Sequence, residues 1–163
     1  MRICPFKGHL NSIGDHIVIK TEPRAFSIKK RKEAPFLTFS VICENGSVIA
    51  TLPIKTVSEG NCNENWRKRH ARHKSQKEAV RLALNPHLSK ISLPCQVTLT
   101  RYAPRLLDEF ENLPMSFKWI YDTICDCLIP GLQPGRADED KRIKVKACQE
   151  KSKLHGVRIE ITY

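Results

Sequence analysis

Residues 107–128 read LDEFENLPMSFKWIYDTICDCL, an acidic run that leads into an amphipathic segment. From Leu113 to Leu128 apolar residues recur every three or four positions, which is the spacing of one face of an α-helix. Pro114 falls in the expected first turn, where its missing N–H costs little. We therefore predict a helix over 113–128 that packs its apolar stripe on a β-sheet.

The same helix has a polar side. Glu111 lies at its start, and Lys118 and Asp122 follow at spacings that return to one face. A second acidic run, ADEDKRI, occupies 137–143. Hard divalent cations prefer oxygen ligands and promote phosphodiester hydrolysis by activating water. The two runs suggest a divalent-metal site acting on a nucleic-acid phosphate, although helix capping and a solvated loop would also account for them.

The order of these motifs resembles that of the RusA family of Holliday-junction resolvases, above all its phage and prophage members. The shared pattern is an acidic-x-acidic-Asn-Leu run, a helix with a lysine, a Gly-x-x-Asp-x-Asp-x-x-Ile run and closing strands. It covers roughly Thr51 to Tyr163. The family implies three metal-binding acids, and this chain has glutamate at both positions of the first motif, where the family has aspartate.

The resemblance implies three kinds of role for individual residues: catalysis, metal binding and ordering of the site. Lys118 matches a catalytic lysine of the phage-type helix, and Asn112 matches the asparagine that orders the site. The implied catalytic and metal-binding acids are Glu109, Glu111 and Asp140, with Asp108 and Asp138 as possible further ligands.

The whole chain is strongly basic. It has 163 residues and a formal net charge of +11, which suits one domain with a core and favours a polyanionic partner, most often nucleic acid. No apolar run is long enough to span a bilayer. We expect a cytoplasmic protein of a bacterial or phage-infected cell, with no membrane partner.

A second helix, predicted over 65–84, carries much of the positive charge. Val80 and Leu84 would supply its core stripe, and we expect Trp66 to be a buried anchor. Such a helix can follow a phosphate backbone, although a solvated charged face is the simpler alternative. The residues assigned to DNA contact, on this helix and just before the first acidic run, are Arg67, Lys68, Arg69, Arg72, Lys74, Lys77 and Arg105.

Several strands are expected around these helices. Asn45-Gly46 between two β-rich runs predicts a hairpin over 36–52. Alternation predicts a strand over 93–100 that leads to the first acidic run. Two further strands, 143–148 and 157–162, would form a C-terminal hairpin. The expected fold is therefore α+β: a single RusA-like domain with a mixed β-sheet and two main helices packed on it.

The expected domain boundaries are 1–33 for an N-terminal extension of unknown role and 34–163 for the RusA-like endonuclease domain. The expected function is a Mg²⁺-dependent, structure-selective endodeoxyribonuclease that resolves Holliday junctions or other branched DNA in recombination and repair, with Mn²⁺ as an alternative ion. A four-way junction needs two symmetric cuts, so we expect a homodimer. Two alternatives stay open: a non-catalytic binder of branched DNA on the same fold, and a basic structural or RNA-associated protein.

Overall fold

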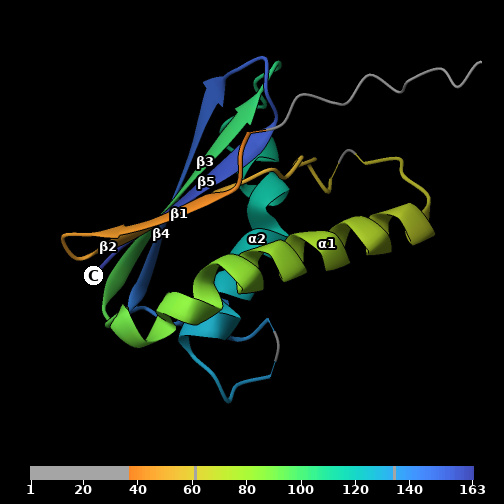
Figure 1. Cartoon of the computed structure of the whole chain (residues 1–163). Coiled ribbons are helices and arrows are strands. Elements are labelled where there is room, and N and C mark those ends of the chain that lie inside the picture. The colour runs from red at the N-terminus through yellow and green to blue at the C-terminus, as the bar shows by residue number, and fades with distance from the viewer. Residues whose placement is uncertain (1–36, 61, 134) are drawn as a thin grey trace, which may run out of the picture. The chain divides into compact units, whose positions relative to one another are not determined.

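Two helices cover one face of a five-stranded sheet in the computed structural model, which describes residues 37–60, 62–133 and 135–163 (Figure 1). The helices are α1 (Trp66–Leu84) and α2 (Asn112–Leu128), close to their predicted bounds. The α+β fold with two main helices on a mixed sheet is thus confirmed. The predicted extension over 1–33 lies outside the described residues.

The sheet has the strand order β1-β2-β5-β3-β4. β3 and β4 are parallel, whereas every other neighbouring pair is antiparallel. The turn between the first two strands is formed by Asn45 and Gly46 with φ of 43° and 75°, the positive values that a tight hairpin of this kind requires. The strands are β1 (Ser40–Glu44), β2 (Ser47–Leu52), β3 (Cys95–Ala103), β4 (Ile143–Lys151) and β5 (Gly156–Thr162).

The predicted C-terminal hairpin is wrong, because β3 lies between β4 and β5. Leu99 of β3 is opposite Ala147 on one side and Ile159 on the other. Helix α2 returns the chain parallel to β3, as a crossover connection does. The loop after β4 then passes the end of β3, where the Ser152 N–H donates to the Ala103 carbonyl at 3.0 Å. This loop carries the chain to the far side of β3.

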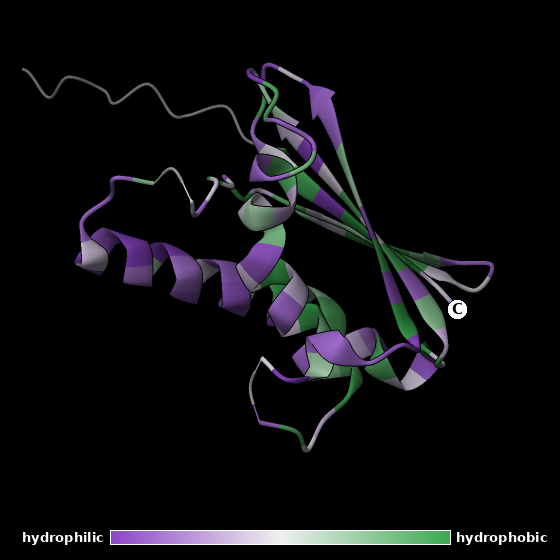
Figure 2. Cartoon of the chain, turned by 180° about the vertical axis from the view of Figure 1, so that it is seen from behind, coloured by the Kyte–Doolittle hydropathy of each residue, from purple (hydrophilic) through white to green (hydrophobic). Residues whose placement is uncertain are grey.

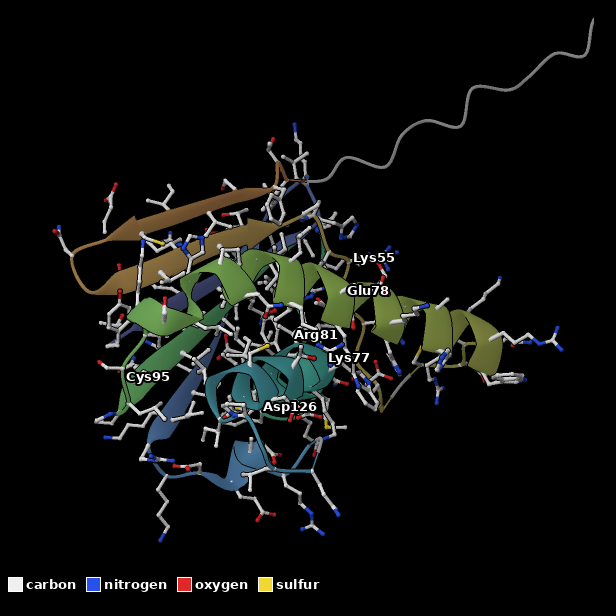
Figure 3. The ribbon with its side chains drawn as sticks, turned by 60° about the horizontal axis from the view of Figure 1, so that its bottom comes forward. Lys55, Lys77, Glu78, Arg81, Cys95 and Asp126 are labelled. Carbon is white, nitrogen blue, oxygen red and sulfur yellow. The ribbon has the colours of Figure 1, made fainter. Side chains whose placement is uncertain are left out.

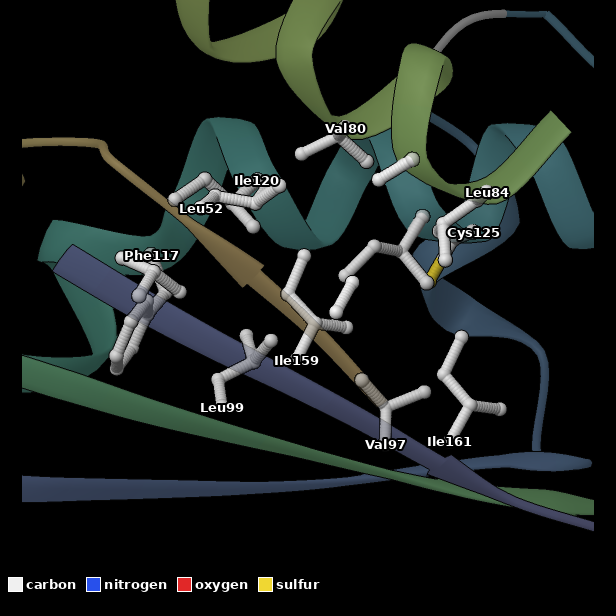
Figure 4. Packing of buried hydrophobic residues seen from close by; sticks show 14 of the residues in the cluster. Leu52, Val80, Leu84, Val97, Leu99, Phe117, Ile120, Cys125, Ile159 and Ile161 are labelled. Carbon is white, nitrogen blue, oxygen red and sulfur yellow. The ribbon is translucent and has the colours of Figure 1, made fainter. Parts of the chain in front are cut away.

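The core lies between the sheet and the helices. From α2, Phe117 and Ile120 are at most 2% exposed and lie over sheet residues such as Leu99 and Ile159 (Figure 4). Most of α1 is hydrophilic (Figure 2), and its buried apolar residues gather at its C-terminal end, among them Val80. This arrangement leaves the first turns of α1 extending beyond the sheet (Figure 1).

Trp66 is not the buried anchor that we predicted. Its side chain is 70% exposed, and the Arg67 guanidinium lies 5.5 Å from its ring centroid. At 1.5 Å per residue, Trp66 is about 21 Å along the helix axis from Val80. The first turn of α1 therefore lies too far from the apolar core for Trp66 to join it.

Candidate functional site

A pocket of about 380 Å³ lies beside the polar face of α2. Lys118 and Asp122 of α2 line it, and Val145 of the edge strand β4 lines it as well. Asp138, from the second acidic run, belongs to the same lining. The fold therefore brings one carboxylate of the second run to the face of α2 that the sequence identified as polar.

Asp122 is the most buried carboxylate of this pocket. The residue is only 8% exposed, and the Lys118 Nζ lies 3.3 Å from its Oδ2. Burial raises the pKa of Asp122; the Lys118 ammonium opposes that rise, and the negative charges of Asp138 and Asp126 add to it. The resemblance did not assign Asp122 a role, although the helical spacing placed it on the face of Glu111 and Lys118.

Two further groups near this carboxylate stay neutral. Burial raises the pKa of the Cys125 thiol to about 12 and also raises the pKa of the Tyr121 phenol. A thiol with this pKa has almost no thiolate at neutral pH. The arrangement therefore suits cation or phosphate binding through oxygen and nitrogen groups, and it does not suit attack by a cysteine.

The acids of the first run, 108–111, lie at the start of α2. The Asp108 Oδ2 accepts hydrogen bonds from the backbone N–H groups of Glu111 at 2.8 Å and Asn112 at 3.3 Å. These bonds lower the pKa of Asp108. Asp108 therefore holds the backbone that leads into α2, ahead of the N-cap residue Glu111. Asp108, Glu109 and Glu111 are all exposed.

Asp140 is paired with Arg142. The Arg142 Nη2 lies 2.8 Å from the Asp140 Oδ2, its Nε donates at 3.1 Å, and its backbone N–H donates at 2.9 Å. These bonds lower the pKa of Asp140 to about 2. Asp140 is therefore ionised, but its oxygens are engaged by a cation of the protein itself.

The implied acids are not assembled into one metal site in this arrangement. Across 37–60, 62–133 and 135–163, no three His, Cys, Asp or Glu side chains lie close enough together to hold a metal ion. Asp122 and Asp138 both line the pocket beside α2. Burial and the negative charges of Asp138 and Asp126 raise the Asp122 pKa, and a cation in the pocket would oppose that rise. Mg²⁺ often binds one or two carboxylates and keeps several waters. Mg²⁺ binding stays a prediction.

Asn112 is tied to the loop that precedes α1. The Ser58 hydroxyl donates to the Asn112 Oδ1 at 2.6 Å, and Ser58 is buried. The same loop is held to α1 by Glu59, which accepts from Arg72 at 2.7 Å and lies 3.1 Å from the His73 Nε2. The loop thus links the basic helix to the acidic start of α2.

The basic residues assigned to DNA contact fall into three groups according to their contacts. Arg69 and Arg72 hold the loop: Arg69 donates to the Cys62 carbonyl at 2.7 Å, and Arg72 also pairs with Glu64 at 3.0 Å. The Lys77 Nζ lies 4.8 Å from the ring centroid of Trp119 on α2; Figure 3 shows Lys77 on α1. The exposed members are Arg67, Lys68, Lys74 and Arg105.

No protein-family model and no curated protein matches this chain. Among solved structures, the OmpA-like domain of FopA1 from Francisella tularensis subsp. tularensis SCHU S4 is similar over 80% of this chain and 83% of that chain. The sequence identity is 15% and the TM-score is 0.34, too low to support an argument about fold or function. Within the described part of the chain, no helix has both the length and the apolar character to cross a membrane.

Proposed function

We propose that this chain is a Mg²⁺-dependent endodeoxyribonuclease of the RusA type that cuts Holliday junctions or other branched DNA in recombination and repair. The observation that supports it most is the pocket beside α2, where Lys118, Asp122 and Asp138 share one cavity. Two carboxylates supply oxygen ligands for a divalent cation, and a lysine supplies positive charge for a phosphate. The motif order of the RusA family and the net charge of +11 support the same proposal.

In this proposal Asp122 and Asp138 would hold Mg²⁺ at the pocket beside α2. A bound Mg²⁺ would supply an activated water and would offset charge on the scissile phosphate. Lys118, held 3.3 Å from Asp122, keeps its ammonium at the pocket, where it can contact a phosphate oxygen. Asn112, fixed by the Ser58 hydroxyl, orders the start of α2. The family-implied acids Glu109, Glu111 and Asp140 do not line this pocket, and their part in metal binding stays a prediction.

Exposed basic residues would bind the backbone of the substrate. Arg67, Lys68 and Lys74 of α1 are open to solvent, and phosphate contacts of this kind weaken steeply as salt displaces them. The proposal also includes a homodimer, because a four-way junction presents two symmetric strands to be cut. Its proposed location is the cytoplasm.

The test is to incubate the protein with a labelled synthetic four-way junction, matched duplex DNA and RNA, with Mg²⁺ or with EDTA. The proposal predicts preferential binding of the junction and paired nicks that require Mg²⁺. Equal affinity for all three nucleic acids and no nicking would contradict it, and would favour a basic structural or RNA-associated protein.

Two observations favour a second function, a non-catalytic protein that binds branched DNA. Asp140 is engaged by Arg142 at 2.8 Å, and both first-motif acids are glutamates. A protein of this kind would bind the junction selectively without cutting it in either Mg²⁺ or Mn²⁺. The same assay therefore separates the two functions.

A further inference from the structure

A second cavity has a volume of about 440 Å³, and the titratable residues that line it are all basic. It is formed by three segments that are distant in sequence: 55–58 after β2, 101–107 at the end of β3, and the loop before β5. No acidic residue from the described part of the chain lines it. The basic residues that do so are Lys55, Arg101, Arg105 and His155.

Arg101 is the fixed part of this cavity. It is only 7% exposed, and its guanidinium donates to the Thr56 hydroxyl at 3.0 Å and to the Arg105 carbonyl at 2.7 Å. Both acceptors are neutral, and Arg101 has no ion pair with a described residue. A buried charge with no counter-ion is costly. Arg101 therefore leaves positive charge uncompensated at this cavity.

The pKa values of His155 and Arg101 reflect the positive charge and the burial at this cavity. Burial lowers the pKa of His155, and the positive charges of Lys55 and Arg101 lower it further. Burial also lowers the pKa of Arg101. An anion in the cavity would offset all of these effects, and phosphate oxygens match the forked donors of arginine.

The position of the cavity relates it to the acidic start of α2. Ser58 lines the cavity and also donates to Asn112. Arg105 and Leu107 line it and lead directly to Asp108, which accepts the backbone N–H of Glu111 at the start of α2. Lys55 comes from the segment after β2 (Figure 3). A phosphate here would therefore lie next to the acidic motif.

We propose that this cavity binds one backbone phosphate of the DNA substrate, beside the acidic start of α2. Lys55 and Arg105 are exposed and would contact the phosphate, while Arg101 provides charge from the buried side. This rests on the proposed function and adds to it a specific anchoring point. The same chemistry would accept free inorganic phosphate, so the experiment must separate the two sources.

The test uses binding without metal, so that it does not depend on cleavage. Junction affinity of the full chain is measured by fluorescence anisotropy in EDTA over a series of salt concentrations, for the wild type and for a Lys55→Ala/Arg105→Ala double variant. Loss of one phosphate contact lowers the slope of log affinity against log salt by about 0.9. Lys146→Ala is the control, because Lys146 is exposed and does not line the cavity. Lys146 is opposite Thr98 of β3, three residues before Arg101, so its side chain lies on the other face of the sheet from that of Arg101.

A second measurement, the Tm of the same proteins with inorganic phosphate, identifies the source of the anion. The proposal is supported by a reduced salt slope in the double variant and an unchanged slope in Lys146→Ala, whether or not the wild type cuts DNA. Unchanged slopes with a phosphate-induced Tm rise that only the double variant loses would assign the cavity to free phosphate and overturn the DNA assignment. Unchanged slopes with no Tm rise would overturn both.

Discussion

Asp122 is a buried carboxylate with a cation of the protein beside it. It is 8% exposed, and the Lys118 ammonium lies 3.3 Å from its Oδ2. Burial and the charges of Asp138 and Asp126 raise its pKa despite that ammonium. A carboxyl group with a perturbed pKa in a pocket is a candidate for function, and its titration should be visible in stability.

We predict that the stability of the wild type falls relative to that of Asp122→Asn as pH rises. The folded protein holds the Asp122 proton more tightly than the unfolded chain does, so the stabilisation is present below the ordinary pKa of 3.8 and is lost as pH rises through the higher folded pKa. The Tm of both proteins between pH 3 and pH 7 measures this. A difference in Tm that does not change with pH would contradict the raised pKa.

Mg²⁺ should reverse part of that loss. A cation bound at Asp122 and Asp138 would stabilise the folded state in proportion to the logarithm of its concentration above the Kd. We expect millimolar Mg²⁺ at pH 7 to raise the Tm of the wild type and of an exposed control, Glu150→Gln, but not that of Asp122→Asn. Equal shifts in all three proteins would show that Mg²⁺ acts elsewhere.

At the scale of the elements, the loop before α1 connects the basic helix to the acidic one. Glu59 and Arg72 are 13% and 14% exposed, and they form an ion pair of 2.7 Å. Burial raises the pKa of Glu59, but hydrogen bonds to Arg72 and His73 outweigh it and leave the pKa lowered. Arg72 is therefore a structural residue of this loop as well as a member of a basic helix.

Arg72→Met and Lys68→Met should have opposite consequences. Arg72→Met leaves Glu59 and Glu64 without their arginine and should cost about 1–3 kcal/mol of unfolding free energy. Lys68 is exposed, so its replacement should change stability by less than about 0.5 kcal/mol, but should reduce the salt dependence of DNA binding. Urea unfolding and anisotropy measure the two effects. A stable Arg72→Met with weakened DNA binding would instead place Arg72 at the DNA.

Local elements could be predicted from the sequence because their signals are local. The apolar spacing of Leu113 to Leu128 gave α2, and Asn45-Gly46 gave the hairpin turn. The charge of α1 did not reveal which arginines pair with the loop, because Glu59 and Glu64 lie outside the helix. The exposure of Trp66 was also missed, because helical spacing does not show where the sheet ends.

At the scale of the whole molecule, strand order was the part that sequence could not supply. Apolar and polar residues alternate along β4 and β5, as they would in a hairpin of these two strands. In the observed sheet β3 lies between them instead. This insertion makes β4 the edge strand that lines the pocket beside α2. The family resemblance implied Asp140 as the third metal-binding acid and Asp138 as a possible further ligand. In the fold Asp138 lines that pocket, whereas Asp140 pairs with Arg142.

The most direct measurement is the single-turnover cleavage of a synthetic four-way junction per bound complex, by the wild type, Asp122→Asn and Glu150→Gln. We predict Mg²⁺-dependent paired nicking by the wild type and by Glu150→Gln, and a loss of at least about 100-fold in Asp122→Asn with junction binding retained. Junction binding without nicking by the wild type, in Mg²⁺ and in Mn²⁺, would contradict the nuclease proposal. Cleavage by Asp122→Asn at the wild-type rate would contradict the proposed site.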